Sequence, residues 1–204
     1  MRIKSTTKIN FILIRHGKTQ SNLEKRYLGK INERLCESGI QEIKKNLKEK
    51  KYPLADLVFS SPQERCVQTA KLIYPKSQII KVKNFREINF GDFEGKNFAE
   101  LKNDKKYIRW IKSNGNLKFP NGESRKKFVK RNFVAFKKIV FKIKKSKVQD
   151  LKVSLVVHGG TIMAILSSIT KQDYFNFQVE NGSGFSFTLI CEKSKLKLES
   201  LCKI

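Results

Sequence analysis

FILIRHG, residues 11–17, is an apolar run that ends on a histidine and a glycine, and LVVHGG, residues 155–160, repeats this pattern. These runs contain the only two histidines of the 204-residue chain. Each run predicts a buried strand followed by a tight turn. The carboxyl ends of strands in open α/β sheets form the crevice that holds the ligand. Histidines that only pack in a core would not be expected to follow the same strand-to-glycine pattern. We therefore expect His16 and His158 to meet at one site.

The composition predicts one globular domain, residues 1–204. Hydrophobic residues make up 39% of the chain and charged residues 30%, and the apolar residues occur in periodic blocks. A chain of 204 residues is long enough for one well-buried core. No apolar run is long enough to span a bilayer, and residues 1–7 contain no hydrophobic signal core. We therefore expect a cytoplasmic protein that does not bind membranes.

The formal net charge of +26 predicts a positive potential over much of the surface. A nucleic-acid-binding module would gather basic residues and exposed aromatic residues in one place. Here the lysines are spread through every segment, for example at 44–45, 48–51, 126–127 and 137–138. We favour a lysine-rich composition with weak, nonspecific polyanion binding over a specific nucleic-acid function. A non-catalytic, basic polyanion-binding protein remains the alternative from another functional class.

The chain has four cysteines, Cys36, Cys66, Cys191 and Cys202. None of them forms a C-x-x-C pair, and none lies close to a histidine in sequence. Free thiols are therefore expected. The acidic residues also lack a spacing that would gather them into a cation site, so we expect no metal and no cofactor. A nucleophilic cysteine stays open, with Cys66 the first candidate, because a Cys–His pair need only be close in space.

The hydrophobic periodicity predicts a three-layer α/β/α sandwich. Its sheet is mostly parallel with an antiparallel edge, and a helical cap at about residues 97–145 lies beside the site. Capping boxes are predicted at Ser38 with Gln41 and at Ser61 with Glu64, with Pro62 in the first turn. The expected strands are 8–14, 56–59, 78–82, 152–157, 185–191 and 196–201, and the expected helices are 39–50, 62–74, 98–113, 123–144 and one from about 161.

Positive groups stand where several of these elements begin or end. Arg15 and His16 leave a strand, Arg65 opens a helix, and residues 158–161 run from a strand into a helix. Helix amino termini bind anions through unpaired N–H groups. The two arginines add bidentate donors for oxygen atoms. We therefore expect a pocket that suits a tetrahedral dianion such as phosphate.

The residues around these positions resemble the histidine phosphatase superfamily. An R-H-G tripeptide alone is a weak signal, but here an ordered series spans roughly residues 9–187. Its blocks are 13–19 (LIRHGKT) with Asn22 and 26–29 (RYLG), 60–62 (SSP) with Arg65 and 68–70 (QTA), 86–87 (RE) ahead of Gly91 and 94–95 (EG), Pro120 with 122–124 (GES), and 157–160 (VHGG).

The resemblance implies a phosphatase that acts through a phosphohistidine, with a small phosphorylated metabolite as its substrate. His16 would be the nucleophile, attacking phosphorus through a neutral imidazole nitrogen. Glu87 would give a proton to the leaving oxygen and later activate water. The resemblance also implies that His158, Arg15 and Arg65 stabilise charge in the transition state, and that Asn22, Thr19 and Gly159 help to bind the substrate.

Glu87 must be protonated to act as an acid. Nearby arginines would lower its pKa and a bound phosphate dianion would raise it, so we expect it to be protonated only when substrate is present. The alternative is a solvated loop carboxylate or a salt bridge to Arg86. Asp92 and Glu94 are weaker candidates that could serve only to order the loop.

Within the superfamily, the chain resembles the compact branch that includes alpha-ribazole phosphatase, an enzyme of cobalamin assembly. Cofactor-dependent phosphoglycerate mutases insert extra segments around the acid-bearing loop and the cap, whereas this chain has little spare length between Glu87 and His158. Residues 86–95 (REINFGDFEG) also resemble the ribazole-phosphatase form. Lys18 stands where the family often has an acid, and Phe85 where leucine is usual. A mutase activity remains the alternative, and a monomer and a homodimer both stay open.

Overall fold

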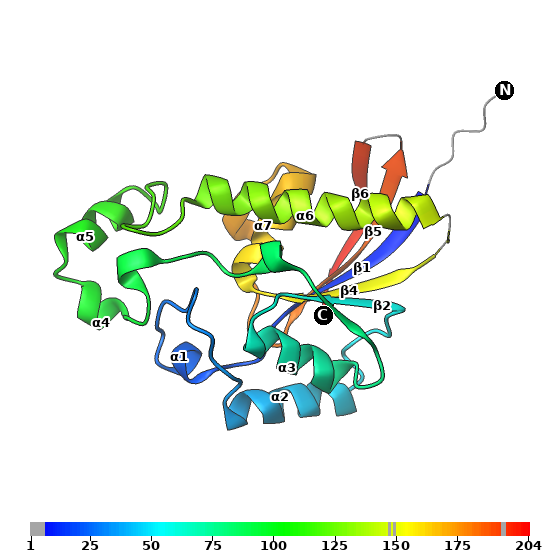
Figure 1. Ribbon diagram of the computed structural model, residues 1–204, viewed down its shortest axis with the longest axis horizontal. Coiled ribbons are helices and arrows are strands. Elements are labelled where there is room, and N and C mark those ends of the chain that lie inside the picture. Colours follow the sequence, from blue (N-terminus) through cyan, green and yellow to red (C-terminus); the bar gives the residue numbers. More distant parts are fainter. Residues whose placement is uncertain (1–6, 147, 149, 193–194) are drawn as a thin grey trace.

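The fold is built around one mixed sheet, as predicted. The computed structural model describes residues 7–146, 148, 150–192 and 195–204 (Figure 1). Strands β1 to β4 run parallel in the order β3-β2-β4-β1, and the antiparallel strands β5 and β6 complete the β1 edge. The strands are β1 (Thr7–Arg15), β2 (Leu57–Ser60), β3 (Ile79–Lys81), β4 (Lys152–Val157), β5 (Gly184–Glu192) and β6 (Lys195–Lys203).

Helices cover both faces of the sheet, with α6 and α7 on one side and α2 and α3 on the other (Figure 1). The helices are α1 (Gln20–Leu23), α2 (Glu37–Lys48), α3 (Glu64–Ile73), α4 (Phe98–Leu101), α5 (Lys105–Lys112), α6 (Arg125–Ser146) and α7 (Gly159–Thr170), with short 3₁₀ helices η1 (Lys83–Phe85), η2 (Gly91–Phe93) and η3 (Tyr174–Phe177).

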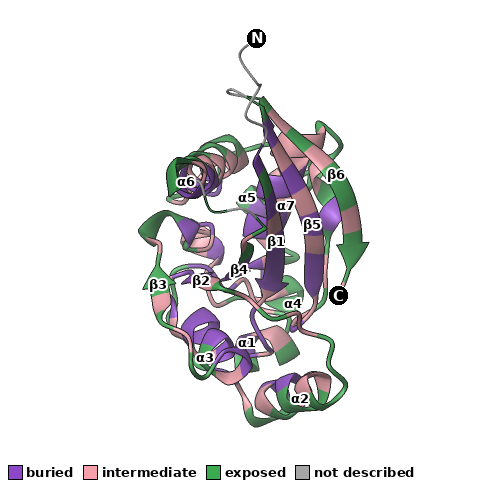
Figure 2. Cartoon of the chain, turned by 90° about the vertical axis from the view of Figure 1, so that its right-hand side faces the viewer, coloured by how far each residue is buried: buried purple, intermediate pink, exposed green. Residues whose placement is uncertain are grey.

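The two faces of β1 supply two separate cores. Successive strand residues point to opposite faces. Phe11 and Leu13 accordingly join the core beneath α6 and α7, whereas Ile12 and Ile14 join the core beneath α2 and α3. Figure 2 shows β1 buried along most of its length, while β6 at the sheet edge is largely exposed. The predicted apolar run is therefore a central strand that fixes the residues after it in place.

Four predicted helix starts lie two residues from the observed ones, among them that of α6, which was predicted from 123 and begins at Arg125. The helix predicted from residue 39 begins at Glu37, without a capping side chain. The helix predicted to be capped by Ser61 begins only at Glu64. Ser61 Oγ accepts the Gln63 N–H at 3.4 Å and lies 2.8 Å from Nε2 of His158, so the hydroxyl combines a local contact with one to a distant strand end. The helix expected from about residue 161 starts at Gly159, directly after His158.

The projecting cap is smaller than predicted. The helix expected at 98–113 is split into α4 and α5, because the Asp104 side chain accepts the backbone N–H of Lys106 and Tyr107 and starts a new helix. The second predicted cap helix is α6, and its apolar stripe packs into the sheet core. The cap that extends beyond the sheet in Figure 1 is thus residues 97–124, which contain α4 and α5.

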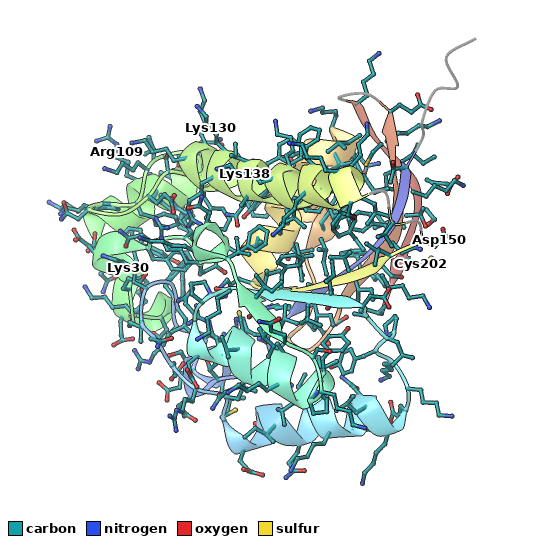
Figure 3. The ribbon with its side chains drawn as sticks, turned by 45° about the vertical axis from the view of Figure 1, so that its right-hand side comes forward. Lys30, Arg109, Lys130, Lys138, Asp150 and Cys202 are labelled. Carbon is teal, nitrogen blue, oxygen red and sulfur yellow. The ribbon has the colours of Figure 1, made fainter. Side chains whose placement is uncertain are left out.

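The basic residues are dispersed in space as well as in sequence. Figure 3 shows Lys30 after α1, Arg109 on α5, and Lys130 and Lys138 on α6, each at the surface. The cysteines are free thiols, as predicted. Within the described ranges, no helix has the length and apolar character that crossing a membrane requires.

Candidate active site

The two histidines meet because their strands are neighbours. β1 and β4 pair in parallel with Arg15 opposite Val157, so His16 and His158 leave the sheet side by side. The backbone N–H of His16 donates to the Val157 carbonyl at 3.0 Å. The two ring centroids are 5.2 Å apart, with the ring planes at 70°. The carboxyl ends of two neighbouring strands thus bring together residues that are far apart in sequence.

His16 is oriented so that one ring nitrogen is available for attack. Its Nδ1 lies 2.8 Å from the Gly17 carbonyl, which accepts a hydrogen bond when Nδ1 carries the proton. Nε2 then keeps its lone pair. Burial, and next the charges of Arg65 and Arg15, hold the pKa of His16 well below its ordinary value. The ring is therefore neutral at physiological pH, as a nitrogen nucleophile must be.

His158 is fully buried beside the ring of His16. Its Nε2 is 2.8 Å from Ser61 Oγ, and its Nδ1 is 3.9 Å from a carboxylate oxygen of Glu87. Burial, followed by the charge of Arg65, lowers the pKa of His158 well below its ordinary value. A neutral imidazole offers one N–H donor and one acceptor nitrogen, so His158 can donate to an oxygen atom bound over His16.

The two arginines approach the histidines from different elements, and each has an unpaired donor. Arg65, on α3, donates to the carbonyls of Ile31 and Gly29 at 2.9 and 3.1 Å through its terminal nitrogens. Arg15 donates to the Val179 carbonyl at 2.8 Å and passes over Gly159, at the start of α7. In the described part of the chain, Nε of both arginines is buried without a partner.

Such orphaned donors are costly unless something accepts from them. A buried polar group without a hydrogen bond costs about 1–3 kcal/mol, and more when it is charged. Here two guanidinium groups carry this cost beside a neutral histidine and a helix amino terminus. An anion with several oxygens would satisfy both.

Glu87 lies near the same strand ends, and hydrogen bonds hold both its backbone and its carboxylate. Its N–H donates to the side-chain oxygen of Gln63 at 2.7 Å, and its carboxylate accepts the N–H of Ile88 at 2.8 Å. A methyl group at Gly160 would lie 2.8 Å from Glu87 Oε1, so only glycine lets the carboxylate sit against α7.

The pKa of Glu87 is raised even without substrate. Burial is the largest cause, and it outweighs the Ile88 amide and the arginines, which act in the opposite direction. Burial thus favours the protonated carboxyl before a phosphate arrives, in addition to the effect expected from the phosphate itself. The expectation weighed the charges of the arginines and left out the loss of water around the carboxyl.

Thr19 and Asn22 mainly hold their own loop. The Thr19 hydroxyl accepts the Asn22 N–H and caps α1, and Asn22 Oδ1 accepts the Thr19 N–H at 3.2 Å. Asn22 Oδ1 also accepts from Asn181 at 3.1 Å, and the Asn181 amide donates to the His16 carbonyl at 3.0 Å. The structure therefore places Asn22 next to the nucleophile turn, while the contacts of Thr19 are those of a helix cap.

Two polar residues at this site, Gln63 and Asn181, were not predicted from the sequence. Their side chains bridge loops that are distant along the chain. The only local signal is the turn-forming pair Asn181-Gly182.

Glu94 orders its surroundings, since its carboxylate accepts the N–H groups of Gly29, Lys30 and Phe90.

Cys66 is not the nucleophile. Its sulfur lies 3.5 Å from Nε2 of His158, but burial raises the pKa of the thiol to about 12. The reactive form of a cysteine is the thiolate, which is scarce at such a pKa.

Among the described residues, no cluster of three or more histidine, cysteine, aspartate or glutamate side chains could hold a metal ion.

Known proteins are similar to this chain in sequence and in fold. Residues 11–199 match the family described as the histidine phosphatase superfamily, branch 1. The chain is 31% identical over 169 residues to the metal-independent phosphoserine phosphatase of Arabidopsis thaliana, covering 78% of this chain and 68% of the relative. It is 29% identical over 181 residues to the adenosylcobalamin/alpha-ribazole phosphatase of Escherichia coli K12, covering 83% and 85%. The phosphoserine phosphatase of Entamoeba histolytica, solved with 3-phosphoglyceric acid, superposes with a TM-score of 0.72 at 26% identity, covering 95% and 96%.

Proposed function

This chain belongs to branch 1 of the histidine phosphatase superfamily and is a phosphatase; we propose that it hydrolyses small phosphate monoesters through a phosphohistidine at His16, without a metal ion. One observation carries this proposal. The neutral ring of His16 lies beside two buried guanidinium groups whose Nε atoms have no partner in the described chain. A phosphoryl group over His16 would fill this positive pocket.

In the first step, Nε2 of His16 forms a bond to phosphorus while the bond from phosphorus to the leaving oxygen breaks. Glu87 gives its proton to that oxygen, and the product alcohol departs. Arg15, Arg65 and the N–H of His158 donate to the phosphoryl oxygens, where charge increases in the transition state. The raised pKa of Glu87 supports this role, because it favours the protonated form of the carboxyl.

In the second step, water attacks the phosphohistidine. Glu87, now a carboxylate, takes a proton from the water as its oxygen bonds to phosphorus, and the bond to Nε2 of His16 breaks. Inorganic phosphate leaves, the ring of His16 is neutral again, and Glu87 is protonated for the next cycle. Each side chain thus ends in the state in which it began.

For the substrate, we propose a small phosphorylated metabolite, with either alpha-ribazole-phosphatase-like or broad specificity. The similarity to an adenosylcobalamin/alpha-ribazole phosphatase supports the first alternative. The phosphoserine phosphatases among the relatives make phosphoserine a second substrate to be tested on the same terms.

The test is phosphate release from alpha-ribazole 5′-phosphate, phosphoserine, 3-phosphoglycerate and p-nitrophenyl phosphate, with a metal chelator present. We expect turnover of at least one ester, no effect of the chelator, and an alkali-stable, acid-labile phosphoprotein after a rapid quench. His16→Ala should remove both the turnover and the trapped phosphate. Turnover that chelation abolishes, or that the alanine variant retains, contradicts the mechanism.

The same panel separates the two alternatives. A phosphoglycerate mutase would isomerise phosphoglycerate faster than it releases phosphate, and it would need a bisphosphorylated cofactor. A non-catalytic polyanion-binding protein would release no phosphate, and its binding to polyanions would weaken steeply with salt. Either result replaces the proposed hydrolase.

A further inference from the structure

Arg131, on α6, lies behind the loop that carries Glu87. One terminal nitrogen, Nη1, donates to the carbonyls of Asn84 and Arg86, each at 2.7 Å. The other, Nη2, donates to the carbonyl of Glu87 itself at 2.9 Å. A single guanidinium group therefore holds three carbonyls within four consecutive residues. No other side-chain hydrogen bond among the described residues fixes this loop at so many points.

Arg131 is itself fixed by Glu123. Nε and Nη2 of Arg131 each donate to a different carboxylate oxygen of Glu123 at 2.8 Å, a bidentate pair. Both side chains are largely buried, at 13% and 15% exposure. The N–H of Glu123 also donates to the Asn89 carbonyl at 2.8 Å, so the same residue holds the far side of the loop.

Phe128 connects this pair to the site. The Arg131 guanidinium lies 4.7 Å from the centroid of the Phe128 ring. The ring in turn comes within 3.1 Å of the position that a methyl group at Gly160 would occupy, where the Glu87 carboxylate also lies. The plane of the guanidinium and the position of the carboxyl are thus fixed against the same aromatic ring.

We propose that Arg131 and Glu123 form a charge-neutral clamp that positions the carboxyl group of Glu87 for proton transfer to the leaving oxygen. The inference rests on the proposed function, since it assumes that Glu87 is the acid. Arg131 touches neither phosphate nor leaving group in this assignment, so it is a positioning residue. Its contribution is to keep the carboxyl within hydrogen-bond reach of one oxygen atom.

The neutrality of the clamp matters because a bare cation behind Glu87 would favour the carboxylate. The charge of Arg131 already acts to lower the pKa of Glu87, and Glu123 offsets that charge at contact distance. Among the salt bridges of the described residues, Arg131 has a carboxylate partner, whereas Arg15 and Arg65 have none. The charged or titratable groups that face Glu87 are Arg15 from β1, Arg65 and Cys66 from α3, Arg131 from α6, His158 after β4, and Tyr174 from η3.

The first test compares two esters of similar size in Arg131→Met. Benzyl phosphate loses an alkoxide that needs a proton, whereas p-nitrophenyl phosphate loses a stable phenolate that does not. We expect kcat/KM for benzyl phosphate, which reports phosphoryl transfer to His16 and not the later hydrolysis, to fall by about 100-fold, and kcat/KM for p-nitrophenyl phosphate to fall by less than about threefold. Arg131→Lys should lie between, because a lysine cannot hold three carbonyls and a bidentate carboxylate. Equal losses on both esters would overturn the clamp.

The second test uses Glu123→Gln, which keeps the shape of the partner and removes its charge. With the cation of Arg131 no longer offset, the pKa of Glu87 should fall. The limb of the kcat/KM–pH profile on which the acid loses its proton should then move to lower pH for benzyl phosphate. The profile for p-nitrophenyl phosphate should keep its shape. An unmoved limb would remove the electrostatic half of the proposal.

Matched controls separate the clamp from the rest of the protein. Lys130→Met removes a neighbouring cation of α6 that lies at the surface (Figure 3), and both esters should be unaffected. Glu87→Gln tests the underlying function: if it lowers kcat/KM equally for both esters, the assignment of the acid fails. If Glu87→Gln is selective for benzyl phosphate but Arg131→Met is not, only the clamp fails. Should Arg131→Met not fold, as judged by thermal unfolding, Arg131→Lys and Glu123→Gln give the same decision.

Discussion

The strand ends around His16 are held by polar contacts between buried groups, whereas the cap at residues 97–124 is held by aromatic packing. Arg65 at the site has three carbonyl contacts and no exposed surface. In the cap, Trp110 stacks near Phe119 with centroids 4.7 Å apart, and Phe98 remains 65% exposed. The first region tolerates little displacement, because hydrogen bonds lose strength over a few tenths of an ångström.

This contrast suggests a division of labour between the two regions. Apolar packing accepts volume-conserving substitutions at modest cost, whereas a polar network loses its function when one partner is removed. We therefore expect the strand ends to determine the chemistry and the cap to determine which leaving group is admitted. Each of the following predictions tests one side of this comparison.

The largest effect is expected for His16→Ala. Removal of this ring should lower kcat/KM by at least about 10⁴-fold on every ester, because the proposed mechanism transfers the phosphoryl group to Nε2 of His16. The melting temperature should change little, since the ring forms no hydrogen bond across elements other than its own turn. Steady-state kinetics with and without added imidazole provide the measurement. A loss limited to one substrate would contradict the assignment.

Arg65→Met should come next, with kcat/KM reduced by about 10²–10³-fold for all esters, as for the loss of a transition-state donor. The inhibition constant of inorganic phosphate should rise in parallel. Arg65 also holds the carbonyls of Leu28, Gly29 and Ile31, so this variant should be less stable. Arg15→Met, which loses a single carbonyl contact, should show the kinetic loss with a smaller drop in melting temperature. The reverse ranking of stabilities would be evidence against this description.

Trp110→Ala tests the cap and should have a smaller, substrate-dependent effect. It removes the ring that packs on Phe119 and Tyr107, and the free energy of unfolding should fall by about 2 kcal/mol. We expect kcat/KM to change by about tenfold for large leaving groups, with p-nitrophenyl phosphate nearly unchanged. A uniform loss across the ester panel would show that the cap also supports the strand ends.

The smallest effect concerns stability and pH. Burial lowers the pKa of His16 and His158 in the folded state, so the unfolded chain takes up protons first as the pH falls. The free energy of unfolding should therefore decrease below the ordinary imidazole pKa of about 6.5, down to the lowered folded values. Glu87 has the opposite sign: its raised folded pKa removes stability as the pH rises from the ordinary carboxyl value to the raised one.

Urea unfolding of the wild type and of His158→Asn at about pH 7.5 and about pH 5.5 measures this difference. The asparagine variant should lose part of the pH dependence, because one titrating group is gone. If both proteins show the same difference between the two pH values, His158 does not titrate below its ordinary pKa.

Local sequence patterns predicted the strands well and the helix starts poorly, and Ser61 shows why. Strand β4 spans the predicted residues, because a continuous apolar run has no competing arrangement in a buried parallel sheet. Ser61 has the local pattern of a helix cap, yet its hydroxyl bonds to His158 from another strand end. Capping rules consider neighbours in sequence, so a contact from a distant strand lies outside them.

The sequence predicted site residues that stand at the ends of strands and helices. It did not predict residues that act by holding another site residue in place. The histidines and arginines follow strand and helix ends, which the sequence marks. Arg131 and Gln63 act on the Glu87 loop from elements whose distance is known only after folding. The direction of the Glu87 pKa likewise depends on how much water the fold removes from the carboxyl.

The position of β1 in the sheet has a consequence for how the chain is made. Among the described strands β1 leaves the ribosome before the others, yet both of its neighbours follow more than 100 residues later: Leu13 is opposite Leu155 of β4 and Phe185 of β5. Until those segments have been synthesised, the nascent protein exposes an apolar strand with two unpaired edges, a template for aggregation. Native pairing of the strand that ends at Arg15 therefore waits until β4, Lys152–Val157, has been synthesised.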